Sequence, residues 1–196
     1  MSCELTSGRV LGCKTSIGGV KAIYLCPHEE LGALTFTNTP TGGGASPHFI
    51  SDIGATTLYK YALPKHTANF TQTITSSVEN GTIFWQQALS VTLHTLDQVT
   101  RAELYLVAIN RLAVFVLDNN DNLFLLGRRD GVEVTEGTHV TGTVKGDLNG
   151  YTLTFTAEEK YPADYVAATD GVSDANYPFD NITTPANITV VAVTGT

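Results

Sequence analysis

The residue types that bind zinc gather near the start of the chain. Cys3, Cys13, Cys26 and His28 offer the thiolate and imidazole ligands of a tetrahedral site. Their spacing contains no C-x-x-C pair, however, and Cys26-Pro27-His28 is a poor pair of ligands for one tetrahedral centre. We therefore interpret the cysteines as buried or incidental thiols. Their odd number and the lack of a secretory signal pattern also argue against a disulfide framework.

A run of Asp and Asn at 118–122 resembles a calcium loop in composition. It lacks the glycine and the terminal glutamate of the twelve-residue calcium pattern. Asp and Asn also bond to their own backbone and tolerate left-handed φ, so they are common in tight turns. We interpret the run as a hairpin turn, and we predict neither a metal site nor a cofactor.

No catalytic constellation is apparent. The chain contains no G-x-S-x-G or H-E-x-x-H motif, and its histidines are scattered. The glycines at 42–44 are not followed by the Lys-Ser/Thr of a phosphate loop. Glu158-Glu159 closes a predicted strand, and we expect both carboxylates to be solvated there. These observations predict a protein that is not an enzyme.

Composition and charge narrow the class of protein. Hydrophobic residues make up 42% of the 196 residues, whereas charged residues make up only 15%. Threonine, a β-branched strand former, replaces much of the charged surface. The net charge of −8 argues against a phosphate-binding surface, although an acidic wall can repel DNA. No apolar run is long enough to span a membrane, so we expect a soluble protein without a membrane anchor.

A long β-hairpin from Asn69 to His94 is the dominant element of the sequence. Asn80-Gly81 predicts a type I′ turn, which places Val78 opposite Ile83 and aligns the two arms. One face of the hairpin is then apolar: Phe70, Ile74, Val78, Ile83, Trp85, Leu89 and Val91. The other face is mostly hydroxyl and amide, with Thr71, Thr73, Thr75, Ser77, Gln86 and Ser90 as candidates to face a pore, and it also carries Phe84 and Ala88.

This hairpin contains a single charged residue, Glu79, and neither Lys nor Pro. A long ribbon without such protection pairs with other chains unless something covers it. We therefore expect the hairpin to be completed by a partner.

The remaining elements predict a mainly β fold. A capping box at Thr95–Gln98 begins one helix over about 96–110, and Val99, Ala102, Leu106 and Ile109 form its expected packing face. A buried hairpin follows at 112–126, then a strand pair at 138–144 and 151–156. We predict Gly/Pro-rich and turn-rich loops at about 35–51 and 160–186. The whole chain, 1–196, is expected to be one β-sandwich or barrel domain of about eight strands, with the hairpin at 69–94 projecting from it.

The order of these elements resembles the tail tube proteins (major tail proteins) of bacteriophages. The resemblance is carried by Ile74–Leu93, Arg111–Gly127, the Arg128-Arg129-Asp130-Gly131-Val132-Glu133-Val134 segment, and Asp147–Glu159. Together these stretches cover roughly the central and later half of the chain.

The resemblance implies a virion structural protein that is made in the host bacterial cytoplasm and assembled into the phage tail. Hexameric rings would stack into a tube through which DNA passes without specific binding. The hairpins would join into one barrel, with the apolar face on its own domain and the hydroxyl face toward the bore. The partners would be further copies of the chain and other phage tail proteins.

Two other hypotheses stay open at this point. A neck, terminator or baseplate protein of the virion would share the tube fold. A sugar-binding β-sandwich would use Trp85, Tyr151 or Tyr161 as a stacking platform, although Trp85 lies on the apolar face of the hairpin, where core packing is favoured.

Overall fold

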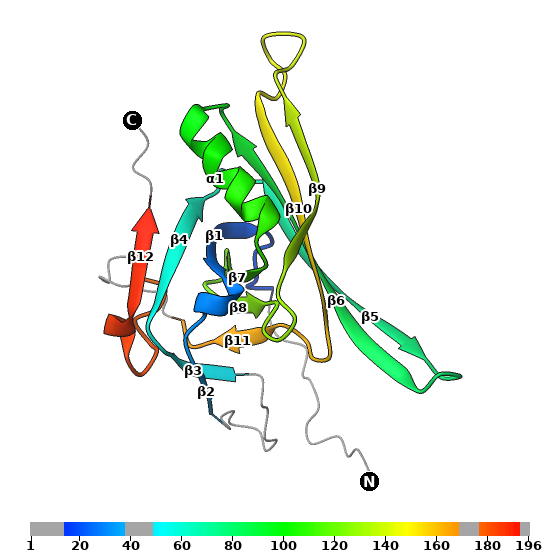
Figure 1. Ribbon diagram of the computed structural model, residues 1–196, viewed down its shortest axis with the longest axis vertical. Coiled ribbons are helices and arrows are strands. Elements are labelled where there is room, and N and C mark those ends of the chain that lie inside the picture. Colours follow the sequence, from blue (N-terminus) through cyan, green and yellow to red (C-terminus); the bar gives the residue numbers. More distant parts are fainter. Residues whose placement is uncertain (1–13, 38–48, 169–176, 193–196) are drawn as a thin grey trace.

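The computed structural model describes residues 14–37, 49–168 and 177–192, and confirms a mainly β fold with two sheets and one α-helix (Figure 1). An eight-stranded sheet has the order β12-β4-β1-β7-β8-β11-β3-β2 and a four-stranded sheet the order β5-β6-β10-β9. Pairing is antiparallel except for β11 with β3 and β12 with β4.

The strands of the larger sheet are β1 (Val20–Pro27), β2 (Leu34–Phe36), β3 (Phe49–Ile53), β4 (Thr56–Ala62), β7 (Leu112–Asp118), β8 (Leu123–Leu126), β11 (Asp164–Val166) and β12 (Ile188–Ala192). The smaller sheet consists of β5 (Ala68–Ser77), β6 (Thr82–His94), β9 (Glu133–Val140) and β10 (Gly150–Glu159). The helices are α1 (Gln98–Ile109) and the 3-10 turns η1 (His28–Glu30) and η2 (Pro185–Asn187).

The central strands β1 and β7 are buried on both faces, which explains their nearly continuous apolar sequence. Ile23 and Val114 point into a first core between the two sheets, which also contains Leu89 and Phe155 from the smaller sheet. Successive side chains of a strand alternate between faces, so their neighbours point into a second core. The two sheets therefore pack as a sandwich around the first core.

The second core lies on the other side of the larger sheet. Ile50 of β3 and Ile188 of β12, from near opposite ends of the strand order, belong to the same buried cluster. The sheet must therefore curl around this cluster. Phe179 fills its centre and makes edge-to-face contacts with Tyr24 and Phe115.

The predicted helix is present, but its cap and its packing face differ from the prediction. Asp97 is the N-cap, and its carboxylate accepts a hydrogen bond from the Thr100 amide at 2.7 Å. Thr95 instead adopts a φ of 72° in the turn that precedes the helix. The buried side chains are Leu104 and Val107.

The four residues predicted to pack, Val99, Ala102, Leu106 and Ile109, are all exposed. The helix therefore carries apolar residues on two faces, and the spacing alone did not tell which of them is buried.

Three predicted segment boundaries were also wrong. The ends of the predicted loop at 35–51 belong to β2 and β3, because Ile50 and Ile53 are buried in the second core; residues 38–48 lie outside the described ranges. The C-terminal segment at 160–186 contains the short strand β11. The strand expected at 138–144 begins at Glu133 and ends at Val140, because the Asp147 carboxylate accepts the amides of Thr143 and Val144 and forms a turn.

Candidate assembly surface

The long hairpin is formed by β5 and β6, and its register is shifted by two residues from the prediction. Ser77 pairs with Thr82, and Ile74 pairs with Trp85. The two strands are connected by the four residues Val78–Gly81, and not by the two central residues of a type I′ turn. Only Gly81 of the Asn80-Gly81 pair has a positive φ, at 62°. A shift of two residues keeps every side chain on its face, since the period of a strand is two. The predicted division into two faces therefore follows from the observed register.

The apolar face of the hairpin is buried at its base and exposed toward its tip. Leu89 and Val91 are 0% and 1% exposed in the first core, and Phe70 and Trp85 are half-buried. Three further apolar residues lie beyond the reach of that core: Ile74 (52% exposed), Ile83 (58%) and Val78 (95%). The chain's own domain thus covers only part of the apolar face.

The opposite face of the hairpin belongs to a larger hydroxyl surface. Thr71, Thr73, Thr75, Gln86 and Ser90 are exposed on it, and Ser77 is half-buried. Strand β10 pairs with β6 and adds Thr152, Thr154 and Thr156 to the same face. We name this surface the outer face of the four-stranded sheet.

Charge on the outer face has one sign. Glu158 lies opposite Gln86, while Glu133 and Glu136 lie opposite Thr156 and Thr154. The strands β5, β6, β9 and β10 contain no Lys or Arg. A phosphate approaching this face would meet carboxylates and hydroxyls but no cation from these strands.

Both edges of this sheet lack a neighbour among the described strands. The edge strands are β5, with ten residues, and β9, with eight. Edge strands of this length present rows of unpaired backbone groups to a further chain. The two ends of the sheet also extend past the body of the domain (Figure 1).

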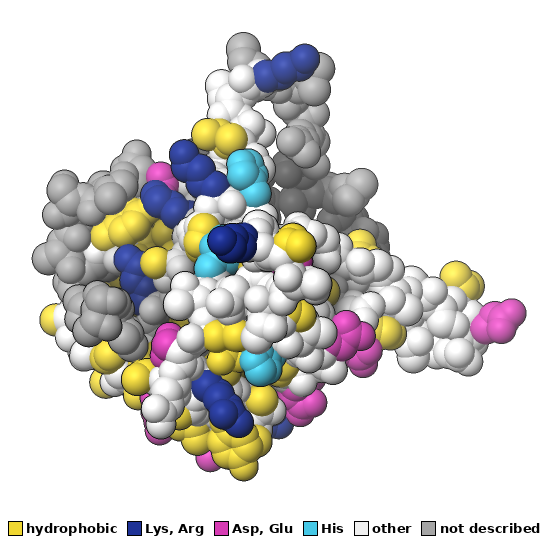
Figure 2. All heavy atoms as spheres, turned by 90° about the horizontal axis from the view of Figure 1, so that it is seen from above, with side chains coloured by type: hydrophobic (Ala, Val, Ile, Leu, Met, Phe, Trp, Pro, Cys, Tyr) yellow, Lys and Arg dark blue, Asp and Glu magenta, His cyan; other side chains and the backbone are white. Residues whose placement is uncertain are grey.

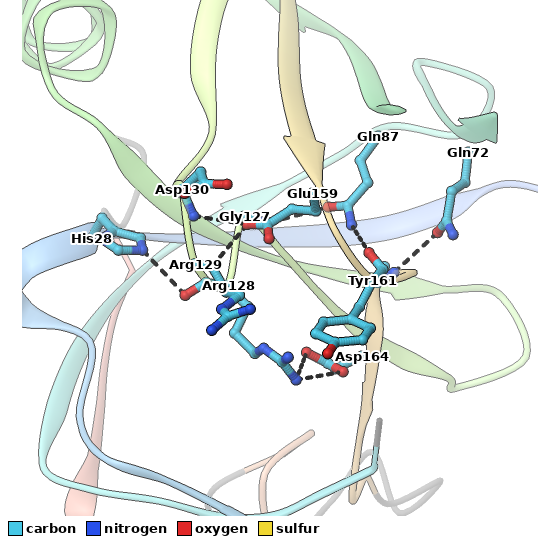
Figure 3. Close-up of polar contacts among 11 residues, drawn as sticks. His28, Gln72, Gln87, Gly127, Arg128, Arg129, Asp130, Glu159, Tyr161 and Asp164 are labelled. Atoms are coloured by element: carbon cyan, nitrogen blue, oxygen red, sulfur yellow. Dashed lines mark hydrogen bonds and ion pairs between the residues drawn. The ribbon is translucent and has the colours of Figure 1, made fainter. Parts of the chain in front are cut away.

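Two paired glutamines anchor the base of the hairpin (Figure 3). Gln87, 2% exposed, accepts a hydrogen bond from the Gly127 amide at 3.1 Å and donates one to the Tyr161 carbonyl at 3.4 Å. Gln72 accepts a hydrogen bond from the Ala163 amide at 3.2 Å. These bonds tie β5 and β6 to loops of the same domain, at the point where the apolar face leaves the core.

Two further polar contacts, made by Glu159 and by Arg128, lie beside the glutamines and form a network with them. Glu159, expected to be solvated, is 3% exposed and accepts the Arg129 and Asp130 amides at 2.8 and 3.0 Å. Arg128 bonds both oxygens of Asp164, at 3.0 and 2.9 Å (Figure 3). Sequence reasoning missed this network; its only signal was that Gln87 and Glu159 interrupt an apolar alternation.

Of the four residues considered for zinc binding, the structure describes Cys26 and His28. Cys26 is fully buried in β1, and burial raises the pKa of its thiol to about 11. His28 contacts the Arg128 carbonyl through Nε2 at 3.2 Å; Cys3 and Cys13 lie outside the described residues. In the described ranges, no group of three or more His, Cys, Asp or Glu is placed to hold a metal ion.

The Asp and Asn run forms the turn between β7 and β8, as predicted. The Asp118 carboxylate accepts the amides of Asn120 and Asn122, both at 2.8 Å. Asp121 has a φ of 60° and binds Lys21 at 2.9 Å and the Tyr177 hydroxyl at 2.6 Å.

The three aromatic residues of the sugar-binding hypothesis do not form one exposed platform. Tyr151 is only 9% exposed and stacks on His139. The Tyr161 ring is contacted by the cations of Arg128, Arg129 and Lys160, and Trp85 is half-buried on the inner side of the hairpin.

Comparison of the chain with protein-family models, with curated proteins and with solved structures found no match. Within the described ranges, α1 is the longest helix, and its 12 residues are too few to span a membrane. We therefore infer the function from the geometry of the four-stranded sheet.

Proposed function

We propose that this protein is a bacteriophage tail tube subunit, without enzymatic activity, that assembles into stacked rings around a channel for DNA. One observation supports this most. A four-stranded sheet, whose two edges have no neighbour among the described strands, carries an exposed hydroxyl and acidic face to which its own strands contribute no Lys or Arg.

Ring closure would use the two edges of the sheet. In a cyclic assembly every interface joins two unlike patches, so β5 of one copy would lie beside β9 of the next. Closure into a barrel removes both edges of the four-stranded sheet, and with them the tendency of unpaired edges to aggregate. Six copies would contribute roughly 24 strands, more than the 16–18 that already enclose an aqueous channel in porins.

The outer face of the sheet suits the wall of such a channel. Hydroxyl and amide side chains keep the wall wet, and the carboxylates of Glu133, Glu136 and Glu158 repel phosphates. The net charge of −8 acts in the same direction. DNA would then pass without being held.

Negative-stain electron microscopy of the purified protein tests the proposal. We expect rings or tubes about 10 nm wide or less, an estimate from packing domains of this size around a pore. In purified virions the chain would be among the most abundant proteins; a few copies per particle would instead indicate a neck, terminator or baseplate protein. Strict monomers at high concentration in several buffers would contradict the proposal.

A further inference from the structure

The end of the β5–β6 hairpin carries an apolar surface that its own domain leaves uncovered. Ile74, Val78 and Ile83 are 52%, 95% and 58% exposed, and we name them the tip patch. Glu79 lies in the turn beside them and is the only charged residue of the hairpin. Figure 2 shows the hairpin as an arm that ends in hydrophobic and acidic side chains.

A second apolar surface covers the outer side of α1. We name Val99, Tyr105, Leu106 and Ile109 the helix patch; these side chains are 61%, 66%, 47% and 60% exposed. Positions three, four and seven residues apart share one side of a helix, so these four form a stripe. Leu104 and Val107 face the first core instead, and the stripe is not part of either hydrophobic core of the described residues.

The two patches are complementary in charge as well as apolar. Arg101 lies four residues before Tyr105 and borders one side of the helix patch. Glu103 lies four residues after Val99 and borders the other side, so the cation that Glu79 can meet is on the Tyr105 side. None of the ion pairs within the described residues involves Glu79 or Arg101. The β5–β6 hairpin projects away from the part of the domain that carries α1, so the two patches do not meet within one chain (Figure 1).

We propose that the tip patch of one copy packs on the helix patch of a second copy, with Glu79 facing Arg101. This inference rests on the proposed ring-forming function and specifies a contact that the edge pairing of β5 and β9 does not include. The contact is heterologous, because each copy offers one tip and one helix face. It removes the exposed apolar side chains of the tip patch and the helix patch from water.

Substitutions at each patch test the contact by sedimentation velocity across a range of concentrations. Val78→Asp and Val99→Asp should each raise the concentration needed for half-assembly roughly tenfold or more. Both sites are exposed, and an acidic side chain in the first turn of α1 suits the helix dipole, so the fold should persist, as circular dichroism will check. Val78→Ile and Val99→Ile keep the patches apolar and are the matched controls.

Charge reversal gives an independent readout. Glu79→Arg and Arg101→Glu should each weaken assembly by roughly threefold, and the double variant should recover it, because the pair is restored with opposite sense. Mixing Val78→Asp with Val99→Asp protein should also form 1:1 complexes, since one intact tip and one intact helix patch remain.

Two results would overturn the inference, and they differ in meaning. If the wild-type chain assembles and the Asp variants assemble at the same concentration, the tip and helix contact is wrong while the ring proposal stands. If the wild-type chain stays monomeric at every concentration, both proposals fail.

Discussion

Gln72 and Gln87 lie directly opposite each other in the β5–β6 hairpin, and each forms a hydrogen bond with a loop of the same domain. On the tip side of this pair, Ile74 and Ile83 become exposed. The glutamine pair therefore marks the point where the hairpin leaves its domain. It holds the arm in one direction, which a subunit needs if the arm is to meet a neighbour.

Replacing Gln87 by leucine should lower stability without unfolding the protein. The buried Gly127 amide would lose its partner at 3.1 Å, and an unsatisfied buried donor costs about 1–3 kcal/mol. Urea denaturation measures the loss. Gln86→Leu is the matched control, because Gln86 is exposed on the opposite face and should change stability by less than about 0.5 kcal/mol. Equal effects of the two variants would exclude the anchoring role.

Gly127→Ala should be strongly destabilising. Gly127 has a φ of 66°, and an added Cβ would lie 2.5 Å from Cγ2 of Val132 and 2.6 Å from its backbone nitrogen. Positive φ and overpacking each cost about 1–3 kcal/mol. A thermal unfolding scan compares it with Gly146→Ala, where nothing lies within 4 Å of the added atom and no comparable loss is expected.

Removing the helix cap should cost about 1 kcal/mol. Asp97 accepts the Thr100 amide at 2.7 Å, and alanine cannot. Asp97→Asn retains an acceptor and should keep most of the stability in the same urea titration. A loss in Asp97→Asn as large as in Asp97→Ala would mean that the carboxylate charge, and not the cap hydrogen bond, stabilises the helix.

Acid should weaken the contact between the β7–β8 turn and the C-terminal segment. The Tyr177 hydroxyl, followed by the Lys21 ammonium, lowers the pKa of Asp121. Its contribution to stability is present above the unfolded-state pKa of about 3.9 and is lost as pH falls through the lower folded-state value.

We therefore expect the urea unfolding midpoint of Asp121→Asn to change less with pH, between about pH 5 and pH 2, than that of the wild-type protein. Tyr177→Phe should also reduce this pH dependence, since it removes the hydroxyl and keeps the ring. An unchanged slope in both variants would contradict this role of Asp121.

The division of the hairpin into two faces could be predicted because it depends only on the alternation of a strand. The register could not, since it is set by a four-residue turn whose positive φ falls on Gly81 alone. The packing face of α1 was predicted wrongly, because Leu104 and Leu106 lie on different sides and tertiary contacts decide between them. Gln87 and Glu159 were missed because their partners are backbone groups of loops far away in sequence.

The central claim is that the four-stranded sheet lines a closed channel with its hydroxyl face inward. Cryo-electron microscopy of the assembled protein tests this most directly. We expect a ring in which β5 and β9 of neighbouring copies lie side by side, with Thr73 and Thr154 facing the bore. A bore lined by the eight-stranded sheet, or a protein that forms no ring at any concentration, would contradict the account.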